Sequence, residues 1–191
     1  MHRHATHKYY TRIFGLIPYY VGLDLKVISQ NIHRIYFIDN DAQIEDKIFL
    51  LEGFPIFFPQ PEANKELFEK PDKRFIPDIF RHEIAMVLVE NGESILFSGC
   101  SHSGIMNIIE KANCFDENCK IKAVFGGLHI HNPISKKNES MDYIEKLTEE
   151  MNGIDSVFYT GHCAGDANFN LLREKLGMQI QTMKTGEVFV L

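Results

Sequence analysis

The chain has 191 residues, 45% of them hydrophobic, and a formal net charge of −6 at pH 7. This size and apolar content predict a single domain over residues 1–191, since no Pro/Gly/Ser-rich linker divides the chain. The acidic balance argues against a nucleic-acid partner, and no apolar run approaches the roughly 20 residues of a membrane span. The four cysteines lack a disulfide-framework spacing and the first residues lack a secretion signal, so we expect a cytoplasmic protein.

The first half of the chain gives few signals. No clear helix or strand is evident before the run 33–38, which predicts a strand ending at the Asp39-Asn40-Asp41 turn. Residues 47–51 predict a second strand. Residues 59–78 are charged and rich in proline, which predicts a loop, or a lid over a site.

The second half is more regular. Residues 84–89 and 94–97 predict an antiparallel hairpin around Asn91-Gly92. The further elements expected are a helix from about 104, strands over 121–125 and 156–159, helices over 139–151 and 166–176, the latter with Asp166 as N-cap, and strands over 178–182 and 188–191. Strands that alternate with helices indicate an α/β fold in which helices cover a sheet.

Histidine and cysteine residues follow several of these strands directly, each time beside glycine. They are Cys100, His102, His129 and His162, with His131 and Cys163 next to them, and His82 stands at the start of the hairpin. The carboxyl ends of strands in α/β proteins converge on a crevice, so we expect these residues to form one site. Imidazole and thiolate ligands suit zinc and iron, which predicts a metal centre.

Three other uses of these residue types are possible. Cys100 could be a nucleophile activated by His102 or His162. Cys114 and Cys119 flank a polar loop and could pair or join Cys100 and Cys163 in a structural-zinc or thiol module. The N-terminal histidines His2, His4 and His7 are interpreted as surface residues, because Thr6 stands where a His-x-His-x-Asp-His metal motif has aspartate.

Four segments together resemble the metallo-β-lactamase superfamily, and more closely its dihydropterin- or ribofuranosylaminobenzene-phosphate-synthase-like branch. They are Phe80-Arg81-His82-Glu83, the turn from Ser98 to Ile105, Gly126-Gly127-Leu128-His129, and the turn from Thr160 to Gly165. The stretch Tyr19 to Asp24 also fits that branch. The resemblance therefore runs along the whole chain.

The resemblance implies an α/β fold, an αββα sandwich with a metal centre at the sheet edge. It implies His82, Cys100, His102 and His162 as metal ligands, and His129, His131, Cys163 and Ser101 as substrate contacts or supports of the ligands. At most one metal per chain is expected, with zinc favoured and iron or manganese as alternatives. The implied activity is hydrolysis of a small phosphate- or ester-bearing molecule by a metal-bound hydroxide.

One departure bears on activity. The superfamily's first metal motif, His-x-His-x-Asp-His, has no counterpart here, so the sandwich is expected to be incomplete and no catalytic residue is assigned. The missing strands would leave a sheet edge unpaired, and we expect a homo-oligomer, or a complementing N-terminal half, to cover that edge. The alternative is a catalytically degenerate or truncated domain that keeps at most one metal and acts by association.

Overall fold

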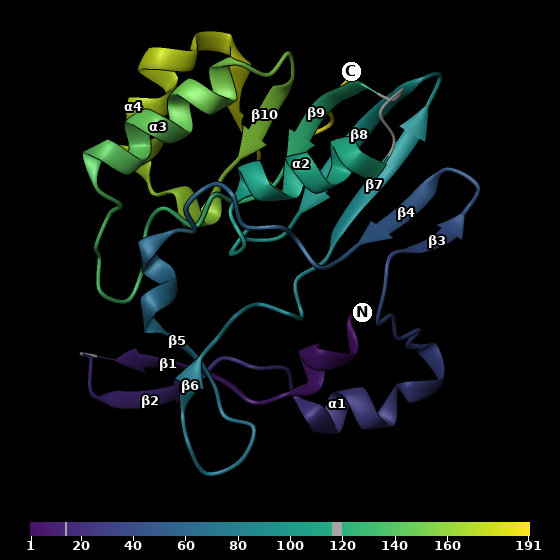
Figure 1. Cartoon of the computed structure of the whole chain (residues 1–191), viewed down its shortest axis with the longest axis vertical. Coiled ribbons are helices and arrows are strands. Elements are labelled where there is room, and N and C mark those ends of the chain that lie inside the picture. The colour runs from purple at the N-terminus through teal and green to yellow at the C-terminus, as the bar shows by residue number, and fades with distance from the viewer. Residues whose placement is uncertain (14, 116–119) are drawn as a thin grey trace.

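The computed structural model describes residues 1–13, 15–115 and 120–191. It forms two lobes, a large lobe at the top of Figure 1 and a small lobe below it. The large lobe holds a seven-stranded sheet in the order β11-β10-β9-β8-β7-β4-β3. Its strands are β3 (Ala42–Glu45), β4 (Ile48–Leu51), β7 (Ala85–Glu90), β8 (Glu93–Ser98), β9 (Lys120–Phe125), β10 (Val157–Thr160) and β11 (Ile180–Thr182). Strands β8 to β11 run parallel, and β3, β4 and β7 pair antiparallel.

Three helices cover one face of this sheet (Figure 1). They are α2 (Ile105–Phe115), α3 (Met141–Asn152) and α4 (Asp166–Leu176), with the short η4 (His162–Ala164) and η5 (Gly177–Gln179) beside α4. Each helix turns an apolar stripe inward, and these stripes meet the sheet in one core. Phe158, Leu96 and Val124 lie side by side across the strands and are at most 2% exposed.

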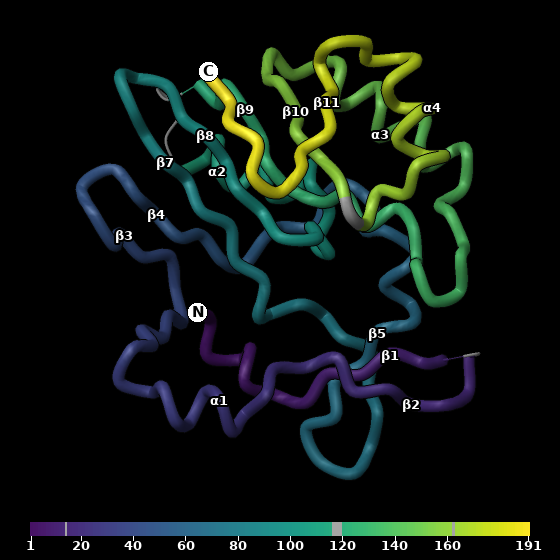
Figure 2. The backbone as a smooth tube through the Cα atoms, turned by 180° about the vertical axis from the view of Figure 1, so that it is seen from behind, coloured from purple at the N-terminus to yellow at the C-terminus, as the bar shows by residue number. Residues whose placement is uncertain are grey.

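The opposite face of the sheet carries a row of aromatic side chains, of which Phe97 and Phe125 are half-buried and Tyr159 is buried. The rings of Phe97 and Phe125 stack at 5.3 Å, and those of Phe125 and Tyr159 at 4.4 Å. The C-terminal segment crosses this face, as the view from behind shows (Figure 2), and its Phe189 packs on Phe125 and Tyr159. No helix among the described residues covers this side.

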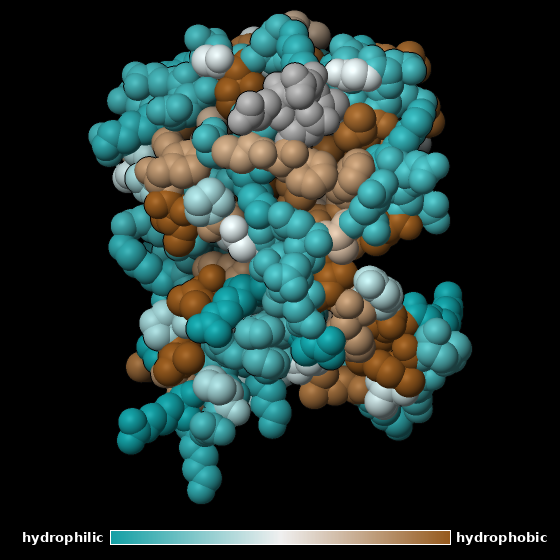
Figure 3. Space-filling model, turned by 45° about the vertical axis from the view of Figure 1, so that its right-hand side comes forward, coloured by the Kyte–Doolittle hydropathy of each residue, from teal (hydrophilic) through white to brown (hydrophobic). Residues whose placement is uncertain are grey.

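The small lobe contains a four-stranded antiparallel sheet in the order β2-β1-β5-β6. Its elements are β1 (Tyr9–Ile13), β2 (Ile17–Tyr20), β5 (Leu67–Glu69), β6 (Ile76–Pro77), the helix α1 (Leu25–Gln30), and the 3-10 turns η1 (Arg3–Thr6), η2 (Ile32–Arg34) and η3 (Glu62–Glu66). Asp24 caps α1 by accepting the N–H groups of Lys26 and Val27. Apolar side chains reach the surface of both lobes (Figure 3).

The expected elements of the second half are confirmed, apart from the last strand. At the hairpin, Asn91 and Gly92 have φ of 53° and 80°, as a type I′ turn requires. Asp166 is the first residue of α4 and Gly165 precedes it as the N-cap, so the expected cap lies one position too late. The segment 188–191 forms no strand and lies across the sheet instead.

Two expectations for the first half are wrong. The run 33–38 was expected as a strand, but residues 32–34 form the 3-10 turn η2, and only Ile38 makes a bridge, with His2. Tyr36 in this run is 72% exposed, and only Ile38 is buried. The segment 59–78, expected as a loop, contains η3, β5 and β6. Its use as a lid stays a prediction.

Among the described residues, no helix has both the length and the apolar character to span a membrane.

Candidate functional site

The site begins where three parallel strands end at the same edge of the sheet. Phe125 at the end of β9 lies between Phe97 of β8 and Tyr159 of β10. The turns after these strands carry Cys100, Gly127 and Cys163, which therefore come together. The backbone N–H of Gly127 donates to the Gly99 carbonyl at 2.7 Å and fastens two of the turns.

These turns form one wall of a cavity of about 530 Å³ between the lobes. Among its lining residues are His82, Cys100, His102 and His129, together with Tyr9 and Asp78. The structure thus brings together four predicted site residues from segments up to 47 positions apart (His82 to His129). None of the residues that line this cavity in the described part of the chain is a lysine or arginine.

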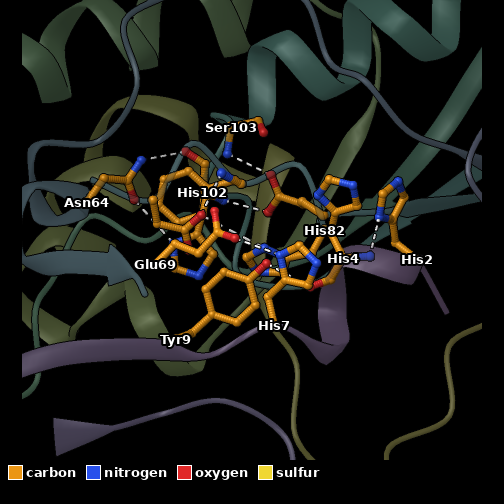
Figure 4. Close-up of polar contacts among 12 residues, drawn as sticks. His2, His4, His7, Tyr9, Asn64, Glu69, His82, His102 and Ser103 are labelled. Atoms are coloured by element: carbon orange, nitrogen blue, oxygen red, sulfur yellow. Dashed lines mark hydrogen bonds and ion pairs between the residues drawn. The ribbon is translucent and has the colours of Figure 1, made fainter. Parts of the chain in front are cut away.

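His102 is held on three sides. The buried carboxylate of Glu83 accepts the backbone N–H groups of His102 and Ser103, each at 2.7 Å (Figure 4). Asn64 donates to the His102 carbonyl at 2.7 Å, and its Oδ1 lies 3.2 Å from His102 Nδ1. The Phe80 ring stacks on the imidazole at 4.7 Å between centroids. These contacts fix the orientation of the ring, whose side chain also shares a hydrogen bond with Cys100.

His82 lies between His102 and the N-terminal histidines (Figure 4). Its Nδ1 is buried and makes no hydrogen bond to any described residue, while Asp78 Oδ1 is 3.9 Å away. The Tyr9 ring packs against it at 4.2 Å. Burial lowers the pKa of His82 to about 4, so the ring is neutral at pH 7 and able to bind a cation.

Asp78 has the opposite shift. Burial raises the pKa of its carboxyl to about 6, although the N–H of Phe80 donates to Oδ1 at 2.8 Å and lowers it in part. A carboxyl that titrates near neutral pH in a cavity can exchange a proton with a bound molecule.

Cys100 and Cys163 form a hydrogen-bonded thiol pair. This bond raises the pKa of Cys100 to about 12 and lowers the pKa of Cys163 to about 7. The backbone N–H of His129 donates to Cys163 Sγ at 3.3 Å and helps to stabilise negative charge there. The two sulfurs therefore hold one negative charge more readily than two.

Backbone strain marks the same turns. Ser101, His129 and Phe80 have φ of 60°, 47° and 54°, in the left-handed region that non-glycine residues rarely adopt. Ser101 is fully buried and its hydroxyl donates to Ser98 Oγ at 3.0 Å, so it supports the turn and does not face the cavity.

The other predicted residues are placed differently. His131 lies outside the cavity lining, and its Nδ1 is 2.8 Å from Asn138 Oδ1. The backbone of His162 belongs to η4, but its side chain lies outside the described part of the structure. Cys114 is exposed, and Cys119 lies outside the described residues, so their pairing stays untested.

The interpretation of the N-terminal histidines as surface residues is wrong for His2. The N–H of Arg3 donates to the Ile38 carbonyl, which draws the segment inward and leaves His2 5% exposed, 3.7 Å from Glu52. His7 Nδ1 lies 2.6 Å from Glu69 Oε1.

The sequence interpretation assigned no role to Glu83, Asn64 or Asp78. Glu83 belongs to the motif Phe80-Arg81-His82-Glu83, and its place next to His82 is the sequence feature that could have indicated its role. Asn64 and Asp78 fall in a segment expected to be a loop.

The donor types fit a zinc-like ion, since the cavity holds two imidazoles with an available nitrogen and a thiol. The buried, unbonded Nδ1 of His82 is what a missing ligand contact would leave. Among the described residues, however, no three His, Cys, Asp or Glu side chains converge closely enough to hold a metal. A complete centre would need His162 or a donor from elsewhere.

Comparison with known proteins identifies the fold. No family model matches the chain. The crystal structure of Tm1679, a metal-dependent hydrolase of the β-lactamase superfamily, superposes with a TM-score of 0.79 over 99% of this chain and 69% of that one, at 23% identity. The chain has the metallo-β-lactamase fold. The expected α/β fold of the metallo-β-lactamase type is therefore confirmed, and the expected incompleteness of the sandwich stays a prediction.

Two curated relatives come from the archaeon Methanocaldococcus jannaschii. A 7,8-dihydropterin-6-methyl-4-(beta-D-ribofuranosyl)-aminobenzene-5'-phosphate synthase is 28% identical over 122 residues, which are 64% of this chain and 40% of the relative. An uncharacterized protein is 34% identical over 80 residues, which are 42% of this chain and 27% of the relative. The matches span less than half of either relative, and the first supports the expected branch of the metallo-β-lactamase superfamily.

Proposed function

We propose that this metallo-β-lactamase-fold chain is the metal-binding part of a hydrolase for a small ester- or phosphate-bearing molecule. The observation that carries the proposal is that His82, Cys100 and His102 line the same cavity and that Glu83 fixes the His102 turn. We propose His82, Cys100, His102 and His162 as the metal-holding residues. Zinc is favoured over iron or manganese by the mixed imidazole and thiolate donors.

A bound ion of this kind would act as a Lewis acid on a carbonyl or phosphoryl oxygen of the substrate. Because the cavity lining includes no lysine or arginine in the described chain, the residues themselves offer no cation to a phosphate. An ester, or a phosphate paired mainly with the ion, is therefore the better fit. Asp78 is the candidate proton acceptor, since its carboxyl lines the cavity and burial raises its pKa to about 6.

Metal content tests this proposal. Protein purified without chelator and then dialysed against zinc should hold about one metal per chain by elemental analysis. His82→Ala and His102→Ala should each lose most of it, because each removes a donor. His131→Ala is the matched control and should keep it, since His131 lies outside the cavity. Full metal retention in both cavity variants would contradict the assignment.

We also propose a partner for the sheet face opposite the helices. By the strand register, Met86, Phe97 and Phe125 lie side by side on that face, and each is half-buried. On this face, the ring contacts of the C-terminal segment with the described residues are those of Phe189 with Phe125 and Tyr159. A second copy, or a complementing N-terminal half, would cover it. Light scattering at micromolar concentration should show a species larger than a monomer, and a clean monomer would count against self-association.

The alternative function is a catalytically degenerate domain that acts by association. The absence of a three-donor cluster among the described residues favours it. Esterase and phosphodiesterase assays on zinc-loaded protein distinguish the hydrolase from the degenerate domain. A hydrolase should show turnover that Asp78→Asn abolishes, and a degenerate domain should show none in either form. A cytoplasmic location stays a proposal.

A further inference from the structure

The two cysteines at the site come from strands that do not touch. Cys100 follows β8 and Cys163 follows β10, with β9 between them. Strands two places apart in a sheet are separated by roughly 10 Å, which is too far for their cysteines to meet without the turns. The turns close this gap, since the Cys163 thiol donates to the Cys100 carbonyl oxygen at 3.8 Å and the two cysteines are therefore in contact.

Gly127 makes this contact possible. A Cβ at this position would lie 2.4 Å from Cys163 Sγ and 3.1 Å from Cys100 Cα. Any larger residue would occupy the space through which the Cys163 thiol reaches over β9. The glycine turn is therefore built around the cysteine pair.

The two cysteines of the pair differ in their access to the cavity. Cys100 lines the 530 Å³ cavity, whereas Cys163 is 5% exposed and lies behind it. A reagent that enters the cavity meets Cys100 first, and Cys163 is already in place to react with the product. The exposed Cys114 lies on α2 and is not part of this arrangement.

We propose that Cys100 and Cys163 are a site of reversible oxidation, at which hydrogen peroxide converts the two thiols to a disulfide. In the first step the Cys100 proton passes to the Cys163 sulfur and the Cys100 thiolate attacks peroxide. The O–O bond breaks, a sulfenic acid forms, and the departing hydroxide takes a proton from solvent to leave as one water. In the second step Cys163 Sγ attacks Cys100 Sγ, the S–S bond forms, and hydroxide leaves with the Cys163 thiol proton as a second water. A dithiol reductant reverses the change: it gives two hydrogens to the protein sulfurs, which become thiols again, and is itself oxidised to a disulfide.

The inference does not depend on a metal. It does predict that oxidation removes the Cys100 thiolate as a metal ligand, so the disulfide and a Cys100-bound metal exclude each other.

Peptide mapping tests the disulfide directly. Metal-free protein is treated with hydrogen peroxide, remaining thiols are alkylated, and the peptides are separated without reduction. We expect a linked Cys100–Cys163 peptide, a loss of two of the four thiols, and recovery of both with dithiothreitol. The link should form at least about tenfold faster in folded protein than in guanidinium, because folding holds the two sulfurs together.

Variants sharpen the result. Cys163→Ala should remove the link and leave Cys100 as sulfenic or higher acid, while Cys114→Ser, the exposed control, should keep the link. Over-oxidised Cys100 in the wild-type chain without any linked peptide would overturn the proposal, as would equal rates in folded and unfolded protein. Neither outcome requires that a variant folds.

Zinc separates this proposal from the proposed metal centre. Zinc added before peroxide should slow the link if Cys100 binds the metal. An unchanged rate would count against Cys100 as a metal ligand, and it would not contradict the proposed oxidation of the cysteine pair.

Discussion

The two lobes differ in how much of their apolar surface they bury. In the large lobe, Phe158, Leu147 and Ile108 are at most 1% exposed within one continuous core. In the small lobe all four residues of β2 are exposed and α1 has no buried residue. Short strands without a packed face are marginal alone. The small lobe is therefore ordered mainly by its contacts with the large one.

Because of this difference in burial, the two walls of the cavity differ in rigidity. Cys100, His102 and His129 stand on turns of the well-packed sheet, so the reactive groups have a rigid base. The opposite wall, including Tyr9 and Leu67, belongs to the small lobe. A cavity with one rigid and one weakly held wall keeps its chemistry fixed while the space for a ligand adapts.

The largest expected effect is in the large-lobe core. Phe158→Ala removes a ring that is 1% exposed between the sheet and the helices and should lower the free energy of unfolding by about 3–5 kcal/mol. Urea unfolding followed by circular dichroism measures the change. A loss below about 1 kcal/mol would mean that this core does not carry the stability of the fold.

The pH dependence of the free energy of unfolding of the metal-free protein is the next test. The pKa of His82 is lowered from 6.5 to about 4, so the unfolded state binds the proton more readily and stability falls as the pH drops from 6.5 towards 4. The expected contribution is about 3 kcal/mol at most. Asp78 acts in the opposite direction, because its pKa is raised to about 6 and its protonation favours the folded state below that pH.

Two variants separate the contributions of His82 and Asp78 to this pH dependence. Asp78→Asn should make the acid loss of stability steeper, and His82→Gln should make it shallower, in urea unfolding series from pH 4 to 7. The reverse order of the two slopes would contradict the burial of these groups.

A smaller effect is expected where the lobes meet the His102 turn. Glu83→Gln leaves one oxygen for two backbone N–H donors, so one buried group loses its partner at a cost of about 1–3 kcal/mol. Glu174→Gln on the exposed face of α4 is the matched control and should stay within about 0.5 kcal/mol. Equal effects of both changes would show that Glu83 does not hold this turn.

The smallest effect is expected in the small lobe. Val27 on α1 is 52% exposed, so Val27→Ser should change the free energy of unfolding by less than about 0.5 kcal/mol. Urea unfolding again gives the value. A loss above about 1.5 kcal/mol would show that another surface covers α1 in solution.

The sequence by itself determined most of the large lobe and the edge where the site lies. Alternating patterns and the Asn91-Gly92 turn predicted the hairpin β7–β8, and apolar spacing predicted α2, α3 and α4, because these elements bury one face against a common core. Glycines after buried strands marked the turns that carry Cys100 and His129. Local spacing sufficed wherever a single element buries a regular stripe.

Only the tertiary structure decided the rest. The strands of the small lobe are two to five residues long and β2 is exposed along its whole length, so they give too short a pattern to recognise. Glu83 meets the His102 turn across 19 positions, and Cys163 reaches Cys100 across 63. Contacts of this kind leave no trace in local spacing, because they depend on how strand ends converge and on the room that Gly127 leaves between them.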